Sequence, residues 1–136
     1  MGKKILIVDD DADMRRVVRG ILEPLGEILE ASNGKDGLRL IATERPALML
    51  LDVAMPDLGG LDILKAARFL DPGLTIVMLT GETGLESAKR ALDDGASAYI
   101  TKPFDADVLR DEIRRLILGV EGVDAASEGR PWSVRR

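Results

Sequence analysis

The sequence predicts an α/β fold in which five parallel strands form one doubly wound sheet. Two observations predict it: short apolar segments alternate with amphipathic segments along the chain, and three of the apolar segments are hydrophobic at nearly every position. Strands that are apolar on both faces are typical of a parallel sheet covered by helices on both sides. The 136 residues suffice for one domain with one core, which we expect over residues 1–118.

The first strand and helix are predicted from an apolar run and the periodic stripe that follows it. Residues 5–8 form the apolar run, and Asp10 or Asp11 can cap the helix that begins after it. Gly26 stands at the position where this helix should end. The apolar stripe expected to face the core consists of Met14, Val17, Val18, Ile21, Leu22 and Leu25.

The remaining elements continue the alternation of strand and helix. Pro46 and Gly95 mark the ends of two helices, and Asp105 can cap the last one. Within the second helix, Leu38 and Ile41 should face inward. Strands are expected over 27–31, 48–51, 75–79 and 98–100, and helices over 34–45, 60–70, 85–94 and from Asp105 to Leu118.

The composition excludes several function classes. The chain has no Cys and no His, which excludes disulfides, thiol catalysis, Ser-His-Asp triads, Cys or His metal sites and a phosphohistidine of its own. A net charge of −5 disfavours direct binding to nucleic acid. Apolar runs are far shorter than the ~18 residues needed to span a bilayer, and no signal peptide is recognisable, so we expect a cytoplasmic protein.

The last segment, residues 119–136, differs in composition from the rest. It contains three Gly and one Pro, and it shows no helical stripe. We therefore expect a flexible C-terminal tail or the start of a linker. Trp132 is then expected to be a residue of this tail rather than an anchor for a partner.

Polar side chains follow four of the expected strands, at the point where each strand ends. Each of them alone is compatible with a helix cap, a local turn or a solvated side chain. Because the carboxyl ends of parallel strands lie at one edge of a sheet, together they predict a common site. The residues are Asp9, Asp10 and Asp11 after the first strand, Asp52 after the third, Thr80 after the fourth and Lys102 after the fifth.

The charge of this group predicts a divalent cation. Asp52 near Asp9 and Asp10 is repelled by like charge, and Lys102 offers one positive charge against three negative ones. Oxygen ligands without His or Cys suit Mg²⁺ best and Mn²⁺ next. Such a site suits a phosphoryl group, and a nucleophilic Asp52 would form an aspartyl phosphate.

These residues stand in sequence motifs that resemble the receiver domain of two-component response regulators. The resemblance covers about residues 3–118, nearly the whole expected domain. It implies a (βα)5 flavodoxin-like fold with strand order 2-1-3-4-5. The motifs are Ile7-Val8-Asp9-Asp10, Leu51-Asp52-Val53-Ala54-Met55-Pro56, Leu79-Thr80-Gly81 and Tyr99-Ile100-Thr101-Lys102-Pro103-Phe104.

The resemblance assigns a role to each residue of the site. Asp52 would be the phosphoacceptor, and Lys102 would form an ion pair with the phosphoryl group. Asp9 and Asp10 would hold Mg²⁺, with Asp10 the more direct ligand. Asp52 itself and the backbone carbonyl of Ala54 would be further metal ligands.

A second set of implied roles concerns switching. Thr80 would bond a phosphoryl oxygen, and its inward movement would let the Tyr99 ring turn in from solvent. This would reshape the surface of the fourth helix, fifth strand and fifth helix, through which receivers often pair as homodimers. The Lys102-Pro103 peptide bond is expected to be cis.

The implied function is that of a phosphorylatable signalling switch and not of an enzyme with a separate substrate. The donor would be a sensor histidine kinase or a histidine phosphotransfer protein, and the output would be contact with a downstream protein. The chain would be a stand-alone receiver or one cut from a longer regulator. Gly59 departs from the family pattern, and Ala54 and Glu82 occupy positions that tune phosphoryl lifetime.

Three other hypotheses stay open on the sequence. A phosphatase of haloacid-dehalogenase type would need a second Asp where Ala54 stands. A flavin-binding electron carrier would need a Ser/Thr-rich loop in place of the first acidic cluster, and aromatic residues, of which the chain has four. A receiver-like module without phosphorylation is the third. On the first helix, Arg15, Arg16 and Arg19 are expected to form a solvated face rather than a kinase contact.

Overall fold

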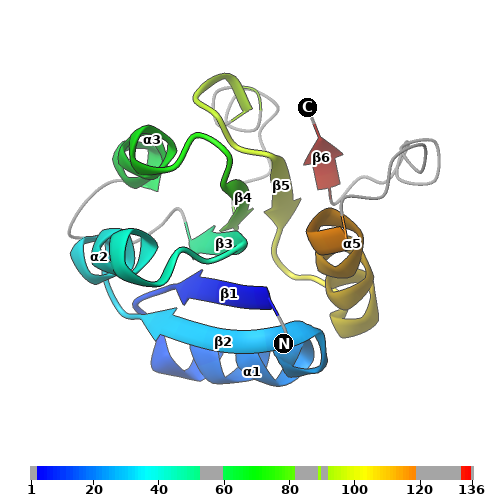
Figure 1. Cartoon of the computed structure of the whole chain (residues 1–136). Helices are drawn as coiled ribbons and strands as arrows, with labels where there is room; N and C mark the ends of the chain where they lie inside the picture. Colours follow the sequence, from blue (N-terminus) through cyan, green and yellow to red (C-terminus); the bar gives the residue numbers. More distant parts are fainter. Residues whose placement is uncertain (1–2, 53–59, 82–88, 90–91, 119–132, 136) are drawn as a thin grey trace.

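The computed structural model describes residues 3–52, 60–81, 89, 92–118 and 133–135. Strands and helices alternate along the chain, as the sequence predicts (Figure 1). The strands are β1 (Lys3–Val8), β2 (Gly26–Ala31), β3 (Leu48–Asp52), β4 (Thr75–Thr80), β5 (Ala98–Thr101) and β6 (Ser133–Arg135). The helices are α1 (Ala12–Leu22), the 3₁₀ turn η1 (Glu23–Leu25), α2 (Gly34–Glu44), α3 (Gly60–Leu70) and α5 (Ala106–Leu118).

The strands form one sheet in the order β2-β1-β3-β4-β5-β6. Neighbouring strands among β1 to β5 are parallel, which confirms the predicted doubly wound fold and its order 2-1-3-4-5. Side chains along each strand point alternately to the two faces. In β3, for example, Leu48 and Leu50 pack on one face and Met49 and Leu51 on the other.

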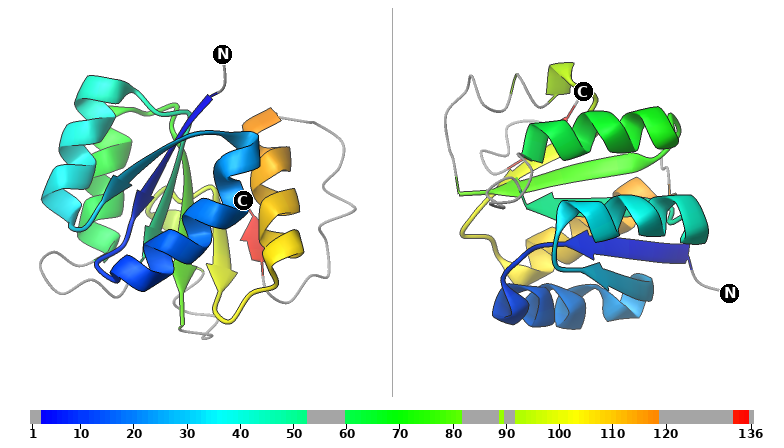
Figure 2. Two further views of the ribbon diagram at one scale, coloured as in Figure 1. Left: turned by 90° about the horizontal axis from the view of Figure 1, so that it is seen from below. Right: turned by 90° about the vertical axis from the view of Figure 1, so that its left-hand side faces the viewer.

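Helices cover both faces of the sheet. Helices α1 and α5 pack on one face, and α2 and α3 pack on the other (Figures 1 and 2). Every residue of β3 is buried, since this strand lies between β1 and β4 and under both helix layers. The interior of the sheet is therefore apolar, and Asp9 and Asp52, two of the three buried charged residues among those described, lie where strands end.

Helix α1 differs from the prediction at its end and on one face. Asp11 caps it, because its side chain accepts hydrogen bonds from the backbone N–H groups of Asp13 and Met14. The α-helix ends at Leu22, and Leu25 belongs to η1, in which Pro24 cannot donate the next helical hydrogen bond. The expectation that Val17 faces the core was wrong, because its residue surface is 54% exposed.

Gly26 ends the helical stretch as expected, because it caps η1, and it is also the first residue of β2. A Cβ at this position would lie 2.2 Å from the backbone oxygen of Lys3. The glycine is therefore required by the close approach of two backbones, where β2 starts to pair with β1.

Other predicted boundaries are confirmed. Helix α3 spans the predicted residues 60–70, and α2 ends with Arg45 in a left-handed conformation just before Pro46. Asp105 caps α5 by accepting hydrogen bonds from the N–H groups of Asp107 and Val108 at 2.9 and 3.2 Å. Most of the expected helix over 85–94 lies outside the described residues.

One strand was not predicted. Ser133–Arg135, inside the segment expected to be a flexible tail, form β6 and pair antiparallel with β5. The other residues of that segment, Trp132 among them, lie outside the described part of the chain, and the domain boundary at 118 stays a prediction. None of the helices in the described ranges is long and apolar enough to cross a lipid bilayer.

Candidate functional site

The site lies at the edge where the parallel strands end. Register brings the strand ends together: Val8 pairs with Leu51, Asp52 with Leu79 and Thr80 with Thr101. Asp9 directly follows β1, Asp52 is the last residue of β3, and Lys102 directly follows β5. The alternation of strands and helices thus gathers residues that are far apart in the sequence, as predicted.

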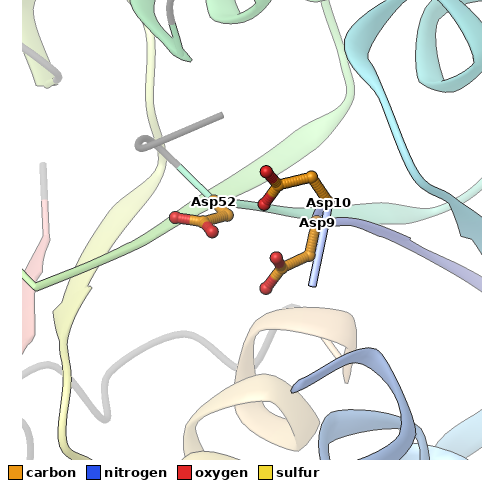
Figure 3. Close-up of side chains that lie close together, drawn as sticks. All are labelled: Asp9, Asp10 and Asp52. Carbon is orange, nitrogen blue, oxygen red and sulfur yellow. The ribbon is translucent and has the colours of Figure 1, made fainter. Parts of the chain in front are cut away.

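Three carboxylates meet at this edge. Carboxylate oxygens of Asp9, Asp10 and Asp52 all lie within 4.8 Å of one another, and the side chains lie side by side in Figure 3. Asp9 and Asp52 are 2% and 5% exposed, whereas Asp10 is exposed to solvent. The cluster therefore has two buried members and one at the surface.

Two hydrogen bonds to backbone groups hold Asp9 in place, one through its N–H and one through its carboxylate. Its N–H donates to the carbonyl oxygen of Ala31 at 3.1 Å, which extends the pairing of β1 with β2. Its carboxylate accepts a hydrogen bond from the N–H of Asp11 at 2.9 Å. The turn from β1 into α1 therefore fixes the inner carboxylate, and the side chain of Asp11 is used separately as the helix cap.

The pKa of Asp9 shows the electrostatic effect of burying carboxyl groups close together. Burial raises the pKa of Asp9 from its ordinary value of 3.8 to about 6, and the neighbouring carboxyl group of Asp52 adds to the rise. The hydrogen bond from Asp11 and the charge of Lys102 act in the opposite direction. A proton is thus held more tightly here than on a solvated carboxyl group, which marks a site that favours positive charge.

Lys102 supplies part of that positive charge. Its Nζ lies 3.5 Å from Oδ2 of Asp52, and both side chains are largely shielded from water. The peptide bond from Lys102 to Pro103 is cis, as expected. One ammonium group next to three carboxylates leaves the cluster with an excess of negative charge.

The donor set fits a small hard cation. All the side-chain donors in the cluster are carboxylate oxygens, and the sequence has no His or Cys that would favour a softer metal. Mg²⁺ is commonly bound by one or two carboxylates and completes its shell with water and phosphate oxygens. The acidic cluster is therefore compatible with Mg²⁺ and with phosphoryl binding.

Other residues assigned from the sequence have different outcomes. Thr80 is the last residue of β4 and pairs with Thr101, so its backbone lies at the expected edge. Ala54, the expected carbonyl ligand, and Glu82 lie outside the described residues. Tyr99 belongs to β5, and it is 3% exposed, so in this structure its ring is already buried against the α2–α3 face of the sheet.

Arg15 contributes to the site in a way that the sequence did not predict. Its Nη1 donates to the backbone oxygen of Asp9 at 2.8 Å, and its Nε pairs with Glu30 of β2 at 3.1 Å. Arg19 also forms an ion pair with Glu30. The expectation of a solvated arginine face was therefore wrong for Arg15, whose side chain is 18% exposed, whereas Arg16 and Arg19 are solvated as predicted.

Comparison with known proteins identifies the class of this fold and site. Residues 5–114 match the family model described as the response regulator receiver domain. The chain belongs to this family, whose members are the receiver domains of two-component signalling systems.

Relatives of known sequence agree with this assignment. The chain is 32% identical over 118 residues to sporulation initiation phosphotransferase F of Bacillus subtilis, covering 86% of this chain and 95% of that protein. It is 36% identical over 129 residues to the response regulator MprA of Mycolicibacterium vanbaalenii, covering 94% of this chain and 56% of that one. The chain thus spans about half the length of the MprA relatives that it matches.

Solved structures show the same fold. A CheY-like response regulator receiver domain from Methanospirillum hungatei superimposes with a TM-score of 0.83 at 36% identity, covering 88% of this chain and 96% of that one. The BeF3-activated receiver domain of DrrB superimposes with a TM-score of 0.80 at 30% identity, covering 87% and 99%. The fold is therefore that of a receiver domain over nearly the whole of each neighbour.

Proposed function

We propose that Asp52 accepts a phosphoryl group from a phosphohistidine and that the modified protein then signals through contact with another protein. The observation that carries this proposal is the meeting of three carboxylates and Lys102 at one edge of the sheet. Asp52 is the member that combines burial with a direct ion pair to Lys102. Asp9 and Asp10 are left to hold a cation.

The transfer requires one bond to form and one to break. A carboxylate oxygen of Asp52 attacks the phosphorus atom, and the new O–P bond gives an acyl phosphate. The P–N bond of the donor breaks, and its electron pair leaves with the imidazole nitrogen. Lys102, which is 3.5 Å from Asp52, stabilises the negative charge on the transferring oxygens. Water later hydrolyses the acyl phosphate and restores the carboxylate.

Asp9, Asp10 and Asp52 would hold Mg²⁺ (or Mn²⁺), together with the backbone carbonyl of Ala54. When bound, Mg²⁺ supplies positive charge to the phosphoryl oxygens. Asp9 is fixed by the N–H of Asp11 and is the structural member of the set, whereas Asp10 is exposed and accessible to a hydrated ion. This division of roles agrees with Asp10 as the more direct ligand.

The proposed signal involves Thr80 and Tyr99. Thr80 would bond a phosphoryl oxygen, and the change at the end of β4 would shift the balance between positions of the Tyr99 ring. The affected surface is that of the fourth helix, β5 and α5, where a downstream protein or a second copy would bind. The donor would be a sensor histidine kinase or a histidine phosphotransfer protein, and the expected location is the cytoplasm.

The test is phosphorylation by a small donor. The protein is incubated with acetyl phosphate and Mg²⁺, and its intact mass is measured. One phosphoryl group should be added, and the addition should vanish in Asp52→Asn and after chelation of the metal. An unchanged mass in the wild-type protein, or the same gain in Asp52→Asn, would contradict the proposal.

A matched control distinguishes the effect of the carboxylate cluster from that of Asp11, an acidic residue next to it. Asp11 is next to Asp10 in sequence, yet its side chain caps α1 instead of joining the cluster. Asp11→Asn keeps a good cap and removes one negative charge. This variant should still be phosphorylated, whereas Asp10→Asn should lose most of the metal-dependent reaction.

A further inference from the structure

The two edges of the parallel sheet are protected in different ways. At one edge, β2 carries Glu27, which is exposed, and Glu30, which is paired with Arg15 and Arg19. Charged side chains on an edge strand discourage pairing with another chain. The opposite edge of the parallel part is β5, and its sequence Ala98-Tyr99-Ile100-Thr101 has no charged residue.

The uncharged edge is occupied by the chain's own β6. Ala98 pairs with Arg135, Tyr99 with Val134 and Ile100 with Ser133, in antiparallel register. Ala98, Tyr99 and Ile100 are all buried. The outward-facing backbone groups of β5 therefore find partners in a strand that lies beyond the domain expected from the sequence.

Without β6, this edge would offer unpaired N–H and C=O groups on an apolar strand. Such an edge is a template for another extended chain. A second copy of this protein can pair with this edge, because two identical strands related by a twofold axis run antiparallel. In such a pair, residue i of one copy contacts residue j of the other, and residue j contacts residue i. The observed antiparallel pairing of β5 with β6 shows that the edge accepts a strand in that direction.

We propose that the C-terminal strand Ser133–Arg135 is a built-in occupant of the β5 edge, and that its release allows a second copy to pair there, β5 against β5. Residues 119–132 connect α5 to β6, so the internal strand competes at the high effective concentration of a tethered segment. The wild-type protein should therefore be monomeric at moderate concentration. This inference does not depend on phosphorylation of Asp52.

The test removes backbone donors from β6 in the full-length chain. Successive N–H groups of a strand point to opposite sides, so Val134→Pro combined with Arg135→Pro removes at least one donor that faces β5, whichever side of β6 pairs with it. We expect faster amide hydrogen exchange at Ala98–Thr101 at low protein concentration. In sedimentation velocity we expect a species of twice the 14.7 kDa chain mass, with dimerisation at least about tenfold tighter than in the wild type.

The matched control is Val134→Ile combined with Arg135→Gln, which keeps both N–H groups and removes the same charge. It should behave as the wild type in exchange and in mass. Unchanged amide hydrogen exchange in the proline variant would contradict the proposal that β6 protects the β5 edge. Faster exchange in a variant that stays monomeric at all concentrations would show that a second copy does not occupy the edge. A dimer that forms in the wild-type protein and is lost in the proline variant would instead indicate that β6 is exchanged between copies.

Discussion

The two ends of the parallel strands differ in how charged side chains are arranged around them. Near the amino ends of β4 and β5, the guanidinium group of Arg68 donates to the backbone oxygens of Pro72, Leu74 and Gly95 at 2.8, 2.6 and 2.6 Å. Near the carboxyl edge of the sheet, three carboxylates lie within 4.8 Å of one another beside Lys102. At the amino ends, a positively charged side chain is surrounded by hydrogen-bond acceptors. At the carboxyl edge, side chains of like charge lie together.

This contrast separates stability from function. Hydrogen bonds from a charged donor to backbone acceptors stabilise the folded state, and they join the turn before β4 to the turn before β5. Like charges brought together destabilise the folded state unless a cation binds. We therefore expect changes at Arg68 to reduce stability, and changes at the carboxylates to alter ligand binding and to raise the stability of the metal-free protein.

The largest expected effect is at the stabilising end. Arg68→Met should lower the free energy of unfolding by about 3 kcal/mol, because the backbone carbonyl groups of Pro72, Leu74 and Gly95 lose a charged donor. Urea denaturation measures this change. Arg39→Met, which alters an exposed arginine paired with Asp36, is the control and should cost less than ~1 kcal/mol. Equal losses in both variants would remove the contrast.

Metal addition should give the next largest effect, at the other end. Mg²⁺ at about a hundred times its dissociation constant should raise the free energy of unfolding by ~2.7 kcal/mol. The gain should be lost in Asp10→Asn and retained in Asp11→Asn, at an ionic strength matched with NaCl. Stabilisation of the same size in Asp10→Asn would mean that the ion binds elsewhere.

The pH dependence of the metal-free protein should show the raised pKa of Asp9. The folded state holds the proton up to about pH 6, and the unfolded state releases it near 3.8. The contribution of this group is thus fully present below the lower value and is lost as the pH rises through the upper one, with a change of at most about 3 kcal/mol. Urea denaturation in a chelator should show this fall, and Asp9→Asn should flatten it.

The smallest effect is expected at an ion-paired surface residue. Hydrogen bonding to Arg19 lowers the pKa of Glu30, so its contribution is present at neutral pH and is lost as the pH falls. Glu30→Gln should cost ~0.5 kcal/mol at pH 7, since Arg15 keeps its bond to Asp9. A much larger loss would show that Glu30 positions Arg15 at the site. Thermal denaturation at two salt concentrations measures it.

Local signals in the sequence predicted much of the fold. Helix α3 begins and ends where its pattern predicts, and Asp11 and Asp105 cap helices as short polar residues do. The charged residues at the strand ends also predicted which side chains meet, because the topology of a parallel sheet brings those ends to one edge.

Features that depend on contacts between distant segments could not be predicted in this way. The apolar stripe of α1 placed Val17 inward because periodicity gives a face but not its width. The pairing of Arg15 with Glu30 joins a helix to a strand, and neither sequence position indicates the other. The three residues of β6 form a strand through pairing with β5, not through a pattern of their own.

Arg68 has a mechanical consequence. It ties the turn that leads into β4 to the loop that leads into β5, so neither strand can slide along the other without breaking several short hydrogen bonds. We therefore expect a perturbation at Lys102, which directly follows β5, to tilt β5 about its clamped amino end rather than to slide it along β4.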